Sequence, residues 1–205
     1  MAELRAKRTA IVGVAENGNT AVLVTLAPGG VLLDRRTVEL TRDLPTHPYH
    51  HEGSWAVGRY VDSPWAREIS LQEAIKLVER VRAAAARGAR ESLEALAEAI
   101  EVPIARISIR ACPELPETTE ERIRDTRAAA MADSIMYREA LASAAEARGW
   151  FVHWYHRDRV FDDAAAALRR KDLDALLREL GKAAGAPWQA KHKLAAAAAL
   201  ALMNR

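Results

Sequence analysis

The segment from Thr9 to Leu40 constrains the fold most, because it holds three apolar, β-branched runs separated by short turns. The first two runs, 9–14 and 21–26, are joined by ENGN, whose residues tolerate the positive φ of a tight hairpin. The third run, 31–40, follows PGG and is interrupted by charged residues, which predicts a strand near the sheet edge with one solvated face. The segment therefore predicts a three-strand antiparallel meander in an α/β protein, with its first strand central.

Length, charge and cysteine content bound the class of protein. A chain of 205 residues can bury one sizeable core, which favours a single domain over residues 1–205 with a loop insertion at about 41–70. The formal net charge is only +2, so any surface for nucleic acid has to be local. The single cysteine, Cys112, excludes an internal disulfide framework and is typical of a reducing compartment. No apolar run approaches the roughly 18 residues that span a membrane, so we expect a cytoplasmic protein without membrane contact.

The rest of the chain predicts helices that return to this sheet. Ser70, with Glu73 three residues later, predicts an N-capped helix in which Gly88 is a candidate break. Asp172 is an expected cap for a later helix. Right-handed crossovers make the two later strands parallel to the first. The expected elements are a helix over 71–100, a strand over 102–110, a helix from Thr118 or Thr119 to Arg148, a strand over 150–156, one or two short helices over 158–180, and a helix over 188–203.

This order of elements resembles the ribonuclease H-like superfamily, and RuvC-type resolvases most. Three stretches carry the resemblance: IVGVAENG (11–18) is similar to the family's apolar strand ending in an acid and a glycine turn, EARGWFVHWYHRDRVF (146–161) to its helix, glycine, fifth strand and basic stretch, and WQAKHKLAAAAALAL (188–202) to its last helix. The resemblance implies a ribonuclease H-like mixed sheet, a three-strand antiparallel meander plus two parallel strands, flanked by helices. It also implies nucleic acid as a partner, divalent metal ions as cofactors, and a homodimer.

The carboxylates that hold metal ions in that family are not retained here. Ala15 stands at the end of the first strand, and Glu16 follows on what should be the opposite face, because neighbouring strand residues alternate. The position at the end of the fourth strand falls at about Arg110, and those of the last helix fall at Gln189 and His192. An intact two-metal carboxylate site is therefore not expected.

Polar side chains nevertheless converge on one edge of the predicted sheet. Ligands of open α/β sheets bind at the carboxyl ends of the strands, and the last helix begins at the same edge. All six histidines lie on strands or loops near it, which indicates a site. The expected group is Glu16, the loop from His47 to Glu52, Arg110, Cys112, Glu114, His153, His156, Asp158, Lys191 and His192.

Three interpretations of this edge stay open. In the first, imidazoles and carboxylates bind Mg, Mn or Zn, and the ion activates water for phosphodiester hydrolysis; the ligands would be His50, His51, Glu52, Glu16 and His192. In the second, a histidine is a general acid or base, because its ordinary pKa lies near neutrality, and the catalytic residues would be Glu16, His156 and His192. In the third, the histidines are ordinary loop, strand and helix residues.

Basic residues fall into two groups. Those on the second long helix alternate with acids, which predicts a solvated, ion-paired face made of Arg122, Arg124, Arg127 and Arg138. Those after the last strand lie beside Trp154 and Tyr155, a mixture that suits base stacking and phosphate neutralisation, with core packing of Trp154 as the alternative. The residues expected to bind nucleic acid are Arg110, Arg157, Arg159 and Lys191.

Two functions follow from these observations. The first is a nucleic-acid-processing enzyme, a metal-dependent nuclease with a nonstandard histidine-containing site. The second is a catalytically inactive pseudoenzyme that binds nucleic acid or a protein partner. The missing carboxylates favour the second, and the histidine clustering favours the first. The ENGN turn is also similar to the phosphate-binding hairpin of sugar kinases and actin-like ATPases, although such a function needs a second domain to close over the nucleotide.

Overall fold

The computed structural model describes residues 9–170 and 172–203. One five-stranded mixed sheet has the order β3-β2-β1-β4-β5. Its strands are β1 (Ala10–Asn17), β2 (Thr20–Ala27), β3 (Val31–Glu39), β4 (Ile104–Arg110) and β5 (Phe151–Tyr155). β2 pairs antiparallel with β1 and β3, and β4 pairs parallel with β1 and β5. The predicted antiparallel meander, the central first strand and the two parallel strands beside it are confirmed.

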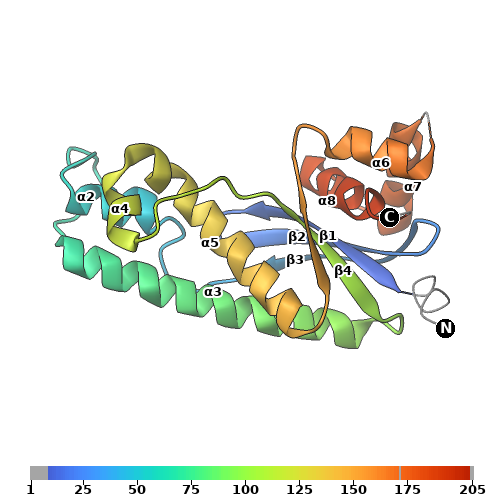
Figure 1. Cartoon of the computed structure of the whole chain (residues 1–205), viewed down its shortest axis with the longest axis horizontal. Coiled ribbons are helices and arrows are strands. Elements are labelled where there is room, and N and C mark those ends of the chain that lie inside the picture. The colour runs from blue at the N-terminus through green and yellow to red at the C-terminus, as the bar shows by residue number, and fades with distance from the viewer. Residues whose placement is uncertain (1–8, 171, 204–205) are drawn as a thin grey trace.

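Helices cover both faces of the sheet (Figure 1). α3 (Leu71–Ala99) and α5 (Thr126–Ala147) pack on one face, and α6 (Val160–Leu168), α7 (Leu173–Ala184) and α8 (Ala190–Leu200) pack on the other. Two separate buried clusters result, because alternate residues of β1 serve different layers. Val12 and Val14 belong to the α3/α5 layer, whereas Ile11 and Ala15 belong to the α8 layer.

The alanine run of α8 is explained by its close approach to β1. A Cβ atom at Gly13 would lie 1.8 Å from the carbonyl oxygen of Ala195, so only glycine fits opposite this helix. Ala195 to Ala199 are fully buried against the sheet. Small side chains on both partners thus bring the helix backbone onto the strand and fix the start of α8 at the carboxyl end of β1.

The segment from 41 to 70 folds into short helical pieces beyond the sheet. A five-residue π-helix, η1 (Tyr49–Gly53), leads into a single turn, α2 (Ser54–Ala56), and α4 (Thr119–Arg124) packs beside them. Gly53 permits this contact, because a Cβ there would lie 2.9 Å from Ile123 Cγ1. Tyr49 and Trp55 are buried, and Tyr60 and Trp65 are exposed.

Two details of the predicted helices are wrong. The helix expected from Thr118 to Arg148 divides at Asp125, whose extended backbone ends α4 and whose Oδ1 accepts a hydrogen bond from Ala128 N at 2.8 Å to start α5. Gly88 does not break α3; it lets the helix approach the backbone of Leu40, where a Cβ would lie 2.2 Å from the carbonyl oxygen.

The predicted caps agree with the structure. Ser70 and Glu73 form a capping box at the start of α3, and Asp172 Oδ1 accepts a hydrogen bond from Ala175 N at 2.8 Å at the start of α7. Between residues 9 and 203, with residue 171 left aside, no helix has the length and apolar character needed to cross a bilayer.

Candidate functional site

Glu16 lies at the end of β1 beside a basic side chain of α5. Both are buried, with Glu16 8% and Arg138 5% exposed. The Arg138 Nε and Nη2 atoms donate to Glu16 Oε1 at 2.9 and 2.6 Å, and Nη1 donates to the carbonyl oxygen of Ala111 at 3.1 Å. Charge-assisted contacts of this kind are the stronger hydrogen bonds in proteins. The Glu16 carboxylate is therefore committed to a guanidinium.

Further basic side chains surround this pair. Arg110 Nη1 lies 3.6 Å from Glu16 Oε1, and Lys191 Nζ donates to the backbone carbonyl of Glu16 at 2.5 Å. Burial lowers the pKa of Lys191, Glu16 opposes that shift, and Arg157, Arg110 and Arg138 lower the pKa further. We call Arg110, Arg138, Arg157 and Lys191 the cationic edge. Four basic groups around one carboxylate leave a positive excess at the carboxyl ends of the strands.

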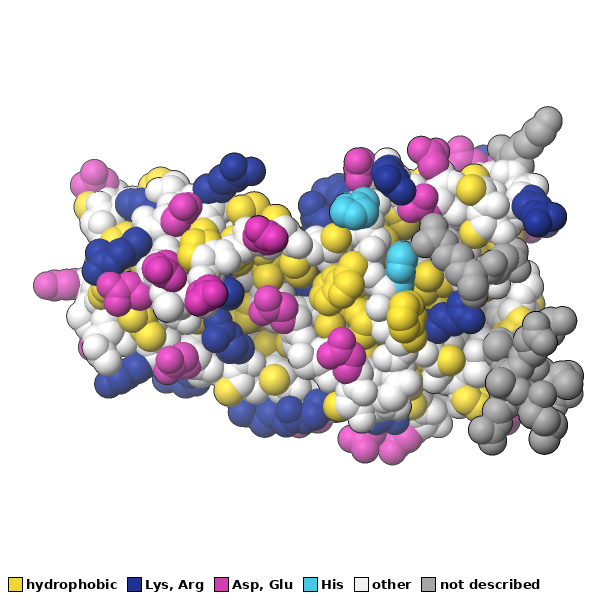
Figure 2. Space-filling model, viewed as in Figure 1, with side chains coloured by type: hydrophobic (Ala, Val, Ile, Leu, Met, Phe, Trp, Pro, Cys, Tyr) yellow, Lys and Arg dark blue, Asp and Glu magenta, His cyan; other side chains and the backbone are white. Residues whose placement is uncertain are grey.

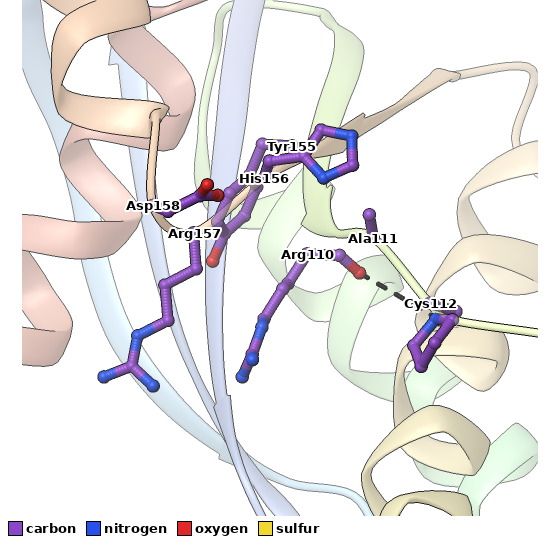
Figure 3. A pocket seen from close by; sticks show the side chains of 8 residues that line it. Arg110, Ala111, Cys112, Tyr155, His156, Arg157 and Asp158 are labelled. Carbon is purple, nitrogen blue, oxygen red and sulfur yellow. Dashed lines mark hydrogen bonds between the residues drawn. The ribbon is translucent and has the colours of Figure 1, made fainter.

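An open pocket of about 640 Å³ lies at the ends of β4 and β5, lined in part by Arg110, Cys112, His156 and Arg157. Figure 3 shows Arg110 and Arg157 extending to the same side of the pocket, away from the His156 ring. In Figure 2, Lys and Arg side chains border a notch between the end of the molecule near α2 and α4 and the end formed by α6 to α8. Asp158 also lines the pocket, but two arginines face this one carboxylate, so the pocket still offers donors to an anion.

Burial favours the protonated form of two other groups at this pocket. The Tyr155 hydroxyl donates to the Val14 carbonyl at 2.9 Å, and burial raises the pKa of Tyr155, so the phenol stays a donor that ties β5 to β1. Burial also raises the pKa of Cys112, an effect that Arg138 partly opposes. A thiol in this state is a poor nucleophile.

His192 lies on the opposite side of the sheet from the Glu16 side chain. Its ring is 6% exposed, stacks on Trp188 at 5.7 Å, and accepts a hydrogen bond at Nδ1 from Gln189 N at 3.1 Å. Burial lowers the pKa of His192, as does Arg35. With Ala15 and Lys191 it lines a second pocket of about 560 Å³. His192 therefore supplies a hydrogen-bond acceptor to a backbone N–H group at the start of α8.

The histidine loop, residues 47–52, is held by a buried carboxylate of α5. Asp133 is 2% exposed and accepts hydrogen bonds from the backbone N–H groups of Tyr49 at 3.0 Å and His50 at 3.1 Å. His47 Nδ1 lies 3.8 Å from Asp133 Oδ2. Burial raises the pKa of Asp133 to about 7, although the two amides lower it and Glu52 raises it. Burial likewise raises the pKa of Glu52.

The predicted metal ligands do not come together. Among residues 9–170 and 172–203, no three side chains of His, Cys, Asp or Glu are arranged to share a metal ion. Glu16 is bound to Arg138, His192 lies across the sheet, and the histidine loop packs against Asp133. The edge does not fit the divalent ion that the family resemblance implies, because an ion there would have to displace a guanidinium from a carboxylate surrounded by cations.

The predicted nucleic-acid ligands are only partly brought together. Arg110, Arg157 and Lys191 belong to the cationic edge, whereas Arg159 is turned to α6, with Nη2 3.8 Å from Asp163 Oδ1. His156 is exposed and lines the pocket, and Trp154 is 39% exposed.

Arg138 was missed by sequence reasoning. Its expected place on a solvated helix face is wrong, because it is buried and bonded to Glu16. Helical spacing carried the signal: Ile135 and Leu141 lie three residues to either side of Arg138, and Ala142 lies four residues on. All three are buried, so the face that Arg138 shares is the core face of α5.

No protein-family model and no curated protein matches this chain. Similar solved structures include Thermus thermophilus RuvC in complex with a Holliday junction substrate, at 15% identity, with 94% of this chain and 91% of that chain covered and a TM-score of 0.49. The structure of Thermus thermophilus RuvC is similar at 15% identity, with 94% and 92% covered and a TM-score of 0.47. At this identity these neighbours assign no activity to this chain.

Proposed function

We propose that this chain is a ribonuclease H-like protein that binds nucleic acid through its cationic edge and does not hydrolyse it. The observation that carries the proposal is the contact of Arg138 with Glu16. A fixed guanidinium sits on the carboxylate nearest the position where the family resemblance implies a metal ligand. The edge therefore holds its own positive charge and needs no ion to attract a phosphate.

The geometry suits a phosphodiester more than a carboxylate-bound metal. Arg110 and Arg157 extend to the same side of an open pocket, and Lys191, in the first turn of α8, donates to the backbone carbonyl of Glu16. Arginine presents a planar fork of donors that matches phosphate oxygens. Phosphate contacts position a nucleic acid without reading its sequence, so this edge should bind many sequences with similar affinity.

Support for hydrolysis at this edge is weaker. Glu16 Oε1 already accepts two hydrogen bonds from Arg138, so it is committed to the guanidinium. Burial keeps the pKa of the Cys112 thiol above its ordinary value. His156 is close to the pocket but exposed, and a general base usually needs an orienting partner. The proposed role is therefore that of the catalytically inactive binding protein.

Binding titrations with fluorescent oligonucleotides test this proposal. Arg110→Ala should weaken binding about fivefold to tenfold for all sequences, and should reduce the slope of log affinity against log salt by about 1. The matched control is Arg124→Ala, which removes an exposed arginine paired with Glu120 on α4. Equal affinities of wild type and Arg110→Ala would refute the assignment of the edge.

The same protein should be incubated with labelled oligonucleotides and Mg, Mn or Zn. We expect no cleavage. Metal-dependent cleavage that disappears in His192→Ala, in a protein that still folds, would establish the nuclease hypothesis instead. The expected homodimer and protein partner stay predictions, and light scattering of the purified chain tests the first of them.

A further inference from the structure

A row of aromatic rings crosses the histidine loop. The His47 and His51 centroids are 5.4 Å apart, those of His51 and His50 are 5.5 Å apart, and those of His50 and Tyr60 are 5.9 Å apart. The buried Trp55 lies under His51 in a stacked arrangement, at 6.0 Å and 17°. The row therefore packs on the core through the contact of His51 with Trp55.

The outer side of this row faces solvent. His51 is exposed, and Tyr60 is 54% exposed although it is a large aromatic residue. Tyr60 also has φ of +56°, a left-handed conformation that is rare for bulky residues. Strained residues of this kind persist where the surrounding structure fixes them, and they concentrate at binding sites. Burial lowers the pKa of His47 and His50, and His51 lowers both further.

The row begins beside the cationic edge. A Cβ at Gly18, in the turn after β1, would lie 3.6 Å from His47 Cε1, which places this ring against the hairpin. Gly18 lies in the turn directly after β1 and is two residues from Glu16 in sequence. The His47 end of the row thus lies against the turn that follows Glu16, at the same end of β1 as the cationic edge.

We propose that the ring row of His47, His51, His50 and Tyr60 is a stacking platform for the bases of single-stranded nucleic acid. This inference rests on the proposed function, because the cationic edge would hold the phosphates of the same strand. Charged grooves combined with aromatic side chains are how proteins bind single strands without sequence preference. A duplex keeps its bases stacked on each other, so it has no bases to offer to this row.

The test compares a 20-nucleotide oligothymidine with a duplex of the same length. Tyr60→Ala and His51→Ala should each weaken single-strand binding about tenfold and change duplex binding less than twofold. Tyr60→Phe should keep wild-type affinity, because the ring is retained. The matched control is Phe151→Ala, which removes a ring that is 63% exposed at the amino end of β5, away from the cationic edge. A 2-aminopurine in the strand reports stacking directly through loss of its fluorescence.

The outcomes separate the platform from the proposed function. If Tyr60→Ala and His51→Ala bind single strands like wild type while Arg110→Ala weakens binding, the platform is overturned and the edge stands. Equal weakening of single-strand and duplex binding also overturns stacking. If the wild-type protein binds neither nucleic acid, both inferences fail. Thermal melting of each variant shows that the fold is kept, as expected for side chains on the surface.

Discussion

Two buried carboxylates, one bound by a side chain of α5 and one belonging to α5, are stabilised in different ways. Glu16, in the cationic edge, meets the guanidinium of Arg138. Asp133, in α5 itself, meets the backbone amides of Tyr49 and His50 and no arginine or lysine at salt-bridge distance among the described residues. The first is an ion pair, and the pKa of the second is raised to about 7 because burial penalises its charge.

The difference bears on what each region can do. Arg138 and Glu16 neutralise each other, so the excess cations Arg110 and Lys191 set the potential of the edge. A buried carboxyl with a pKa near 7 makes the histidine loop sensitive to pH instead. One region is suited to constant attraction of anions, and the other to a state that changes with protonation.

The largest expected effect is loss of the Glu16 partner. Arg138→Ala should lower the free energy of unfolding by about 3–5 kcal/mol, because it leaves a buried carboxylate without its cation. Denaturant melts measure this. The double variant Glu16→Gln with Arg138→Met removes both charges at similar volume and should recover most of the loss. A single variant within 1 kcal/mol of wild type would mean that Glu16 finds another cation at the edge.

Asp133→Ala should destabilise less, by about 1–3 kcal/mol, because it leaves two backbone N–H groups of the histidine loop without an acceptor. Denaturant melts at pH 7 measure this loss. The matched control is Asp125→Ala, which removes an exposed carboxylate that caps α5 through one amide and should cost about 1 kcal/mol. Equal losses of unfolding free energy in the two variants would show that the burial of Asp133 does not raise the cost of removing it.

The pH dependence of Asp133 sharpens the comparison. Between its ordinary pKa of 3.8 and its folded value of about 7, the folded state holds a proton that the unfolded chain has released. Stability from this site is therefore present below pH 4 and is lost as pH rises toward 7. The Tm of wild type minus that of Asp133→Asn should fall steadily from pH 4.5 to 7.5.

Other groups near Asp133 remain in both proteins of that experiment, so only the part of their titration that depends on Asp133 enters the difference. The lowered pKa values of His47 and His50 make stability rise with pH below their ordinary value, and the raised pKa of Glu52 acts in the sense of Asp133. Parallel Tm profiles of wild type and Asp133→Asn would show that Asp133 does not titrate in this range.

The sequence predicted the fold better than the site, for physical reasons. Strand periodicity and turn residues are local, so the meander and its central first strand could be predicted from residues 9–40. The caps Ser70 and Asp172 are also local. The partner of Glu16 could not be predicted from spacing, since Arg138 lies 122 residues away and belongs to a helix rich in charged residues.

The histidines show the same limit. The sequence places all six histidines on strands or loops near one edge of the sheet. The role of each depends on the face of the sheet that it occupies and on how deeply it is buried, and both are set by packing. His192, in the first turn of α8, lies on the same side of the sheet as Ala15 and accepts a hydrogen bond from Gln189 N. The histidine loop is held instead by hydrogen bonds to Asp133. The spacing of Gln189 and His192 is that of a capping box, but the contact of Asp133 with residues 83 and 84 positions away has no signature in composition or spacing.

The His192 contact predicts a smaller effect than either carboxylate. His192→Ala should destabilise by about 1 kcal/mol through loss of the hydrogen bond to Gln189 N, and should leave the oligonucleotide affinity within twofold of wild type. Thermal melts and binding titrations on one preparation measure both. A loss of binding without a loss of stability would place His192 in direct contact with the ligand.

The smallest expected effect tests whether depth, and not charge pairing alone, sets the cost at Arg138. Arg124 Nε and Glu120 Oε1 on α4 are 2.8 Å apart, about as close as Arg138 and Glu16, but both side chains are largely in solvent. Glu120→Ala should therefore cost at most about 0.5 kcal/mol, since water and salt screen an exposed pair. Denaturant melts at low and high salt should agree for the Arg138 variant and differ slightly for the Glu120 variant. If the two variants cost the same, burial would not be what makes the Glu16 pair strong, and the contrast with Asp133 would lose its physical basis.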